Sequence, residues 1–179
     1  MLTVKDLEQF QAQHPDYRME LVNGEVIVTS LSGYESAEVA TRMGGKLFAS
    51  VDDRKLGRIT GSSAGFILPN SDTRAPDVSF VRAERLRQSP RGFAELAPDL
   101  MVEVKSPSDS VTKLRAKIQQ FLELGTQVGI LLNPDDQTVE IYRQEQSTIV
   151  LRDGDILTIP DLFPGWQVAV EELWSPRFD

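Results

Sequence analysis

The sequence predicts a mixed α/β fold, in which helices flank a central sheet and short β-hairpins are added toward both ends of the chain. Two apolar runs, 100–104 and 127–133, are separated by an amphipathic stretch. A strand–helix–strand unit of this length favours a parallel crossover within one sheet. Asn23-Gly24 between two β-prone runs is a strong signal for a two-residue hairpin. Apolar residues also recur at helical spacing across 34–51.

Length and composition limit the classes of protein to which the chain can belong. With 179 residues, 40% hydrophobic and 26% charged, the chain resembles an ordinary soluble globular protein. We expect one domain over 1–179, with an N-terminal helix and hairpin in 1–33, the core in 34–143, and a C-terminal hairpin and tail in 144–179. No apolar run reaches the length of a membrane span and the N-terminus does not resemble a secretory signal, so we expect a cytoplasmic protein without a membrane partner.

Several classes of site are excluded or disfavoured by counts alone. The absence of cysteine rules out disulfides and thiolate zinc sites, and His14 is the only histidine, with no nucleophile elbow near it. No Gly-rich phosphate loop is present, so no nucleotide cofactor is expected. The net charge of −8 and the pI near 4.7 argue against a general nucleic-acid binder, although they leave room for a local basic surface.

The N-terminal third contains a helix, a hairpin and a second helix. Thr3 is a typical N-cap for a short helix that ends before the proline at position 15. Glu20 and Glu25 flank the hairpin turn, and we expect both to be exposed surface charges rather than catalytic groups. Glu35 lies in the first turn of the next helix, where an acidic residue interacts favourably with the helix dipole. This interaction is enough to explain its position, and a role in a metal site is the less favoured interpretation.

The middle of the chain is the most basic part. Strands are expected over 58–61 and 65–69, followed by a turn and the strand that begins near Asp77. The stretch after that strand carries four arginines, and a solvated connector and a phosphate-facing loop are both open readings of it. They are Arg82, Arg85, Arg87 and Arg91.

After 106–110 the pattern predicts an amphipathic helix that stops at Gly125. Lys117 borders its apolar face and is placed to lean toward the sheet. The run 127–133 suits a strand buried on both sides, and 138–143 a half-exposed strand. The segments 147–151 and 155–159 are expected to form another hairpin, and the apolar tail to pack on the body or on a second subunit.

The run 97–107 carries the candidate chemistry. Because strand side chains alternate, Glu103 and Lys105 point to one face, and burying such a pair is costly unless its charge is used. If 75–81 pairs with this strand, Asp77 stands beside Glu103. Two carboxylates suit Mg²⁺, which can polarise a phosphodiester and activate water. Lys105 is placed to position or deprotonate that water, or to neutralise charge; an ordinary edge-strand ion pair is the alternative.

Pro76-Asp77 together with Glu103-Val104-Lys105 resembles the PD-(D/E)XK nuclease signature. The wider set resembles the Uma-two family of restriction-endonuclease-like proteins; its matching pieces are 20–25, 75–81, 97–104, 106–108, Lys117 and 125–134. The resemblance implies a restriction-endonuclease-like core, a divalent-metal site at Asp77 and Glu103, and often a homodimer. We add DNA as the expected substrate, Mg²⁺ or Mn²⁺ as the cation, the backbone carbonyl of Val104 as a further ligand, and Glu20 and Glu35 as less favoured extra acids.

The chain departs from the family pattern in its lysines. Family members usually carry an apolar residue where Lys105 stands, and the helix lysine, here Lys117, is taken as the migrated catalytic lysine. A histidine is frequent where Ser36 stands. We therefore expect a divalent-metal-dependent DNA endonuclease with Asp77 and Glu103 as ligands and both lysines as catalytic residues. The rival is a non-catalytic binding or regulatory module that keeps the fold; hydrolysis of another phosphodiester is a third reading.

Overall fold

A six-stranded mixed sheet forms the centre of the protein, in the computed structural model that describes all of residues 1–179. Its strands follow the order β10-β9-β8-β7-β6-β3. β7 and β8 are parallel, whereas every other neighbouring pair is antiparallel, so the predicted mixed sheet and its parallel crossover are confirmed. The bounds are β3 Gly57–Gly61, β6 Val78–Arg82, β7 Leu100–Val104, β8 Val128–Asn133, β9 Thr138–Tyr142 and β10 Ile149–Leu151.

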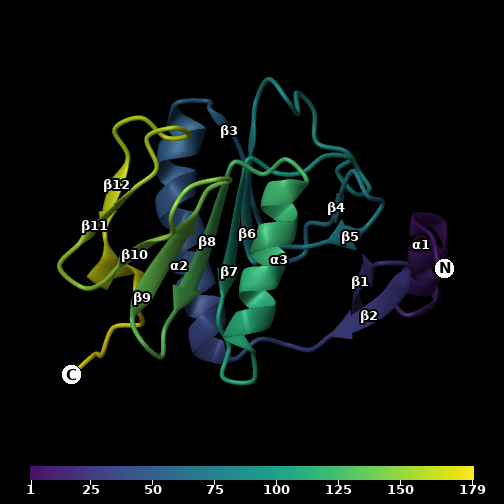
Figure 1. The fold of residues 1–179 in the computed structure, drawn as a ribbon, viewed down its shortest axis with the longest axis horizontal. Coiled ribbons are helices and arrows are strands. Elements are labelled where there is room, and N and C mark those ends of the chain that lie inside the picture. Colours follow the sequence, from purple (N-terminus) through teal and green to yellow (C-terminus); the bar gives the residue numbers. More distant parts are fainter.

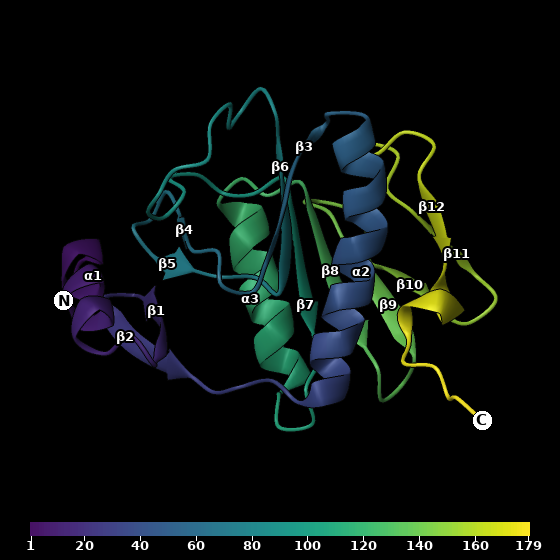
Figure 2. The ribbon, with the colours of Figure 1, turned by 180° about the vertical axis from the view of Figure 1, so that it is seen from behind.

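Two long helices cover opposite faces of this sheet (Figures 1 and 2). α2 (Tyr34–Asp53) places its apolar stripe on one face, because residues three and four apart share a side of a helix. α3 (Val111–Glu123) packs on the other face and ends as predicted, with Gly125 at a φ of +116° just beyond it. The buried α2 residues are Ser36, Val39, Met43, Leu47 and Val51; those of α3 are Ile118, Phe121 and Leu122.

The N-terminal hairpin and two short strands from the middle of the chain form a smaller sheet beside α3, with the order β2-β1-β5-β4. Thr3 caps α1 (Val4–Gln13) through a reciprocal capping box with Asp6, as the sequence predicts for its N-cap. Asn23 and Gly24 both have positive φ, 51° and 75°, which is what a two-residue hairpin turn of this kind requires. The strands are β1 Arg18–Val22, β2 Glu25–Thr29, β4 Phe66–Ile67 and β5 Thr73–Arg74.

The predicted hairpin between 147–151 and 155–159 is wrong. β10 pairs with β9 and extends the central sheet, whereas β11 (Ile156–Thr158) pairs with β12 (Gln167–Ala169). The local turn forms, since Asp155 N donates to the carbonyl of Arg152, but the two strands then separate. Separation allows the buried Leu157 to join the hydrophobic core on the α2 side of the sheet. Tertiary burial therefore overrides a local turn signal here.

The C-terminal tail packs on the body of the protein, which is one of the two outcomes expected for it. Phe163, Trp166 and the short 3₁₀ helix η1 (Val170–Leu173) contribute to the α2-side core. Trp166 also donates its indole N–H to the carbonyl of Lys46 on α2, at 3.0 Å. No helix in the structure combines the length and the apolar character that crossing a membrane requires.

Candidate active site

Asp77 and Glu103 lie side by side on the sheet face that α3 covers. β6 and β7 pair antiparallel with Val78 opposite Val102, and continuing that register by one residue sets Asp77 opposite Glu103. Asp77 Oδ2 accepts a hydrogen bond from the backbone N–H of Val104 at 2.8 Å. The pairing that the sequence made conditional is therefore present, and two carboxylates converge at the end of two central strands.

Lys117 of α3 completes this pair with a positive charge. Its Nζ lies 2.9 Å from Glu103 Oε1 and 3.3 Å from Glu20 Oε1, and it donates to the carbonyl oxygen of Ala75 at 3.0 Å. The contact with Glu103 is an ion pair between two side chains that are each no more than 12% exposed. The helix thus leans its lysine inward, as its border position on the apolar stripe predicts.

Glu20 is buried in this cluster, so the expectation that it is an exposed hairpin charge is wrong. Its side chain is only 4% exposed, and it accepts hydrogen bonds from Ala75 N at 2.9 Å and from Arg74 Nε at 3.2 Å. The reason is a tertiary pairing: β1 lies next to β5, which brings Glu20 against the segment that leads into Asp77. Glu25, at the other end of the same turn, is exposed as predicted.

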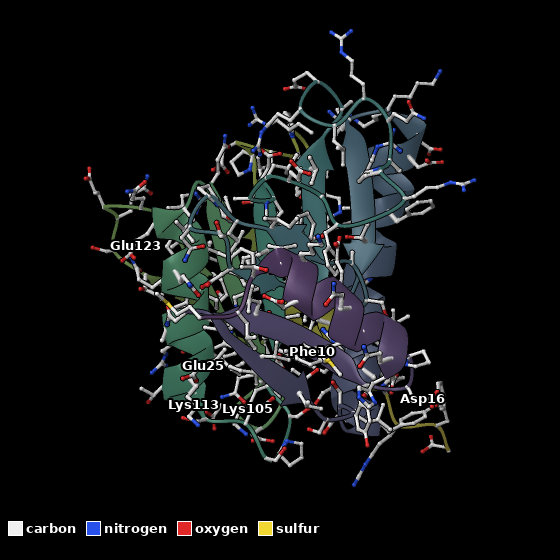
Figure 3. All side chains as sticks on the ribbon, turned by 90° about the vertical axis from the view of Figure 1, so that its right-hand side faces the viewer. Phe10, Asp16, Glu25, Lys105, Lys113 and Glu123 are labelled. Atoms are coloured by element: carbon white, nitrogen blue, oxygen red, sulfur yellow. The ribbon has the colours of Figure 1, made fainter.

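Lys105 points away from the carboxylate pair. Its Nζ lies 2.5 Å from Asp135 Oδ2 and donates to the carbonyl of Ser106 at 3.2 Å. β7 ends at Val104, so the strand alternation that would align Lys105 with Glu103 no longer applies. Figure 3 shows Lys105 at the same end of the molecule as Lys113, in the first turn of α3.

The two remaining predicted ligands have different surroundings. Val104, whose backbone carbonyl is implied as a ligand, is buried at the end of β7 directly after Glu103. Glu35 is exposed in the first turn of α2 and makes no hydrogen bond or ion pair with Asp77 or Glu103. The structure therefore brings together Asp77, Glu103, Lys117 and Glu20, and leaves Lys105 and Glu35 outside this cluster.

Burial sets the proton affinities of the two central carboxyls. Burial, with smaller contributions from the nearby Asp77 and Glu20, raises the pKa of Glu103 to about 7, although Lys117 acts in the opposite direction. Burial also raises the pKa of Asp77, although the hydrogen bond from the Val104 N–H and the positive charges of Lys117 and Arg18 act to lower it. Glu103 therefore exchanges a proton near neutral pH.

Lys117 and Glu20 are held in their charged forms. For Lys117 burial acts against the charge, but Glu103 and Glu20 outweigh it and raise the pKa of the ammonium. For Glu20 burial favours the neutral form, but Lys117 and Arg74 outweigh it and lower the pKa of that carboxyl. Of the two carboxyls that contact Lys117, Glu20 is thus the one whose lowered pKa favours the ionised form.

The donor set fits a hard divalent cation with two protein carboxylates. No group of three or more Asp, Glu or His side chains in the chain is arranged to hold a metal ion. Mg²⁺, however, usually takes one or two carboxylates and keeps several waters. The ion pair of Glu103 with Lys117 uses Oε1, and the hydrogen bond of Asp77 uses Oδ2, so Glu103 Oε2 and Asp77 Oδ1 have no protein partner. Both residues therefore retain oxygens with ligand capacity on the same sheet face.

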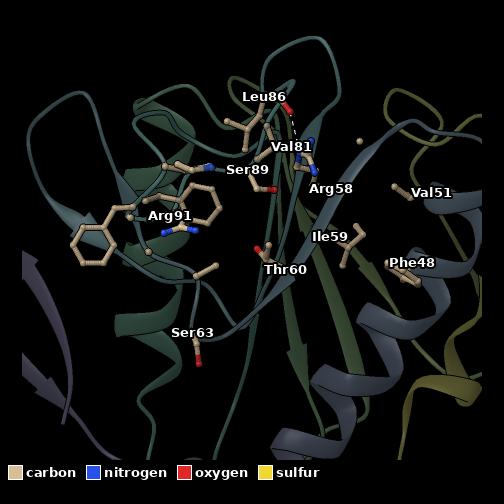
Figure 4. A pocket seen from close by; sticks show the side chains of 18 of the residues that line it. Phe48, Val51, Arg58, Ile59, Thr60, Ser63, Val81, Leu86, Ser89 and Arg91 are labelled. Atoms are coloured by element: carbon tan, nitrogen blue, oxygen red, sulfur yellow. Dashed lines mark hydrogen bonds between the residues drawn. The ribbon is translucent and has the colours of Figure 1, made fainter. Parts of the chain in front are cut away.

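The basic stretch after β6 is partly structural. Arg82 and Arg85 hold Asp99, which is 1% exposed, with nitrogen–oxygen distances of 3.9 and 3.0 Å. Arg87 and Arg91 are exposed. Arg91 borders a cavity of about 460 Å³ between β3 and residues 83–94, which contains none of the predicted site residues (Figure 4).

Asp77 is instead one of the residues that line a groove of about 460 Å³ between α2 and β3. Two cationic residues near this site were missed from the sequence: Arg74, which pairs with Glu20, and Arg18, which donates to the carbonyl of Ala75 at 3.4 Å. Arg18 stands two residues before Glu20 in a strand, so alternation puts both on one face and is the signal that could have found it. Arg74 immediately precedes 75–77, and its sequence position alone suggests proximity to Asp77.

The fold and the paired carboxylates define an α/β protein of the nuclease type. The chain matches the Uma2 family, described as "Putative restriction endonuclease", over residues 4–171, and it belongs to that family. It shares its fold with a crystal structure of "a putative nuclease belonging to DUF820" from Anabaena variabilis ATCC 29413, at 24% identity and a TM-score of 0.78, covering 87% of this chain and 88% of that one. No curated protein matches the chain.

Proposed function

We propose that the protein is a divalent-metal-dependent endonuclease that hydrolyses DNA phosphodiester bonds at the Asp77–Glu103 pair. One observation carries the proposal: Lys117 Nζ stands 2.9 Å from Glu103 Oε1, on the face where Asp77 lies opposite Glu103. Membership in the Uma2 family supports it. Asp77 and Glu103 would hold Mg²⁺ or Mn²⁺ together with the carbonyl of Val104.

The bound cation would supply Lewis-acid polarisation of the phosphodiester and a more acidic water. The chain's own groups then have separable roles. Lys117 stays protonated because its pKa is raised, so it offers positive charge to the developing negative charge on phosphate rather than acting as a base. Glu103, with a pKa of about 7, is able to take or give a proton near neutral pH. Glu20 holds the Lys117 ammonium in place.

Nicking of supercoiled plasmid with Mg²⁺ or Mn²⁺ tests the proposal. Wild-type protein should convert plasmid to the open circular form only when the cation is present, and chelation should stop it. Asp77→Asn keeps the shape of the side chain and the acceptor for the Val104 N–H but removes the charge, and it should abolish nicking. Equal nicking by wild type and Asp77→Asn would show that the activity comes from a contaminant.

A second candidate is a non-catalytic binding or regulatory module that retains the fold. The observation that favours it is the internal neutralisation of the site, since Lys117 and Arg74 already engage Glu103 and Glu20. The net charge of −8 points the same way. Calorimetric titration with Mn²⁺, with and without DNA, separates the two: absence of heat in both titrations would support the module and contradict the nuclease.

The homodimer, the single-domain organisation and the cytoplasmic location stay predictions. The roles of Lys105 and Glu35 also stay predictions, although both lie outside the Asp77–Glu103–Lys117–Glu20 cluster. Removing either side chain should therefore affect nicking much less than removing Lys117.

A further inference from the structure

Arg18 is a half-buried cation beside the candidate site with almost no internal partner. Its Nη2 donates to the Ala75 carbonyl at 3.4 Å, at the long end of the hydrogen-bond range, and its Nε is buried without any acceptor. It forms no ion pair within 4.0 Å, whereas Arg74 nearby is paired with Glu20. Burying a guanidinium nitrogen without an acceptor is costly, so the arrangement is best explained by an acceptor that arrives with a ligand.

The strand geometry aims Arg18 at the same segment as Glu20. Both residues lie on one face of β1, two positions apart, and both hydrogen-bond to Ala75: Glu20 to its N–H and Arg18 to its carbonyl. Ala75 is separated from Asp77 only by Pro76. Arg18 is therefore fixed at the segment that carries a candidate metal ligand.

Arg18 also borders the open surface that leads to Asp77. It lines two clefts, of about 370 and 380 Å³, which also share Asp16, Tyr17 and Ser62. The groove that contains Asp77 shares Ser62 with both clefts. A strand of nucleic acid lying across the surface around Ser62 would pass Arg18 on its way to Asp77.

We propose that Arg18 binds a backbone phosphate of the substrate strand next to the one cleaved at Asp77. The inference rests on the proposed function and extends it to a named positioning residue. A guanidinium fork matches two phosphate oxygens at once, which a lysine ammonium cannot do. The ligand chemistry is a phosphodiester anion; free inorganic phosphate presents similar oxygens and is the alternative source.

Nuclear magnetic resonance of the arginine Nε–H groups tests binding on the wild-type protein, independently of catalysis. A short duplex oligonucleotide is titrated with Ca²⁺ in place of Mg²⁺, and inorganic phosphate is titrated separately. The Arg18 Nε–H signal should shift saturably with the oligonucleotide and hardly at all with inorganic phosphate at the same concentration. An unmoved Arg18 signal in the oligonucleotide titration would overturn the proposal, and an equal response to inorganic phosphate would replace the nucleic acid by a free-phosphate ligand.

Variants then measure what Arg18 contributes. Arg18→Gln should raise the KM for nicking roughly tenfold or more with kcat changed less than about threefold, and should reduce the salt slope of DNA binding by about one. Arg18→Lys keeps the positive charge, so its salt slope should equal that of wild type. Its KM should lie between those of wild type and Arg18→Gln. Arg152 is an exposed arginine on the turn between β10 and β11. Arg152→Gln removes the same charge as Arg18→Gln, and its KM and salt slope should match those of wild type.

The outcomes keep the two proposals apart. If wild type nicks DNA and Arg18→Gln matches it in KM and salt slope, the Arg18 proposal fails and the nuclease stands. If wild type never nicks but the Arg18 signal still responds to the oligonucleotide, the nuclease fails and the phosphate site stands.

Discussion

Lys117 of α3 and Glu103 of β7 meet at 2.9 Å across the interface between helix and sheet, although they are fourteen residues apart in the chain. The contact depends on the crossover: α3 leaves the end of β7 and runs back over the face that carries Glu103. Of the two lysines that the sequence offers, Lys117 contacts the carboxylate pair and Lys105 contacts Asp135 instead.

Replacing the two lysines separately should give very different results. Lys117→Met should lower kcat/KM for plasmid nicking by about 100-fold, because it removes the positive charge beside Glu103. Lys105→Met breaks only a partly exposed pair with Asp135 and should change kcat/KM by less than about threefold. Nicking rates of the two variants under identical Mn²⁺ conditions provide the measurement, and a larger loss in Lys105→Met would reverse the assignment.

Glu103 should make the stability of the metal-free protein fall as pH rises. The folded carboxyl has a pKa of about 7 against an ordinary 4.5, so the folded state binds more protons between these values. Unfolding free energy should therefore decrease by about 3 kcal/mol across this window. Urea denaturation at a series of pH values checks this.

The isosteric variant isolates that contribution. Glu103→Gln cannot ionise, and its stability should lose most of the downward slope that wild type shows. Parallel slopes for the two proteins would mean that another group is responsible.

Metal affinity should rise with pH through the same window. A divalent cation needs the ionised carboxylate, so binding at about pH 6 must displace the proton from Glu103, while binding at about pH 8 need not. Calorimetry with Mn²⁺ in buffers of different ionisation enthalpy should detect proton release that shrinks with pH. A pH-independent affinity would argue that the cation does not contact Glu103, and Asp77→Asn should weaken binding at every pH.

The two hairpin glutamates should differ in their effect on stability. Glu20→Gln removes the ionised partner that the half-buried Lys117 and Arg74 share and should cost about 3–5 kcal/mol of unfolding free energy. Glu25→Gln, in the same hairpin but exposed, should change it by less than about 0.5 kcal/mol. Chemical denaturation of both variants tests the pair, and equal stabilities would mean that Glu20 is not buried in solution.

Much of the fold follows from local patterns, and the failures have a common cause. The Thr3 cap, the Asn23-Gly24 turn and the stop at Gly125 depend on backbone requirements of a few adjacent residues, and all three are present. The parallel β7–β8 pair follows from two apolar runs around an amphipathic helix. The C-terminal hairpin was wrong because Leu157 gains more from the distant core than from its sequence neighbour.

The sequence by itself determined the two carboxylates of the site and the helix that brings a lysine to them. Asp77 and Glu103 are marked by charge in otherwise apolar strands, and Lys117 by its place on the border of an apolar stripe. Only the tertiary structure decided that Glu20 and Arg18 stand beside them and that Lys105 does not. Those positions depend on β1 pairing with β5 and on β7 ending at Val104. A local sequence pattern gives no information about how close in space two segments lie when they are far apart in the chain.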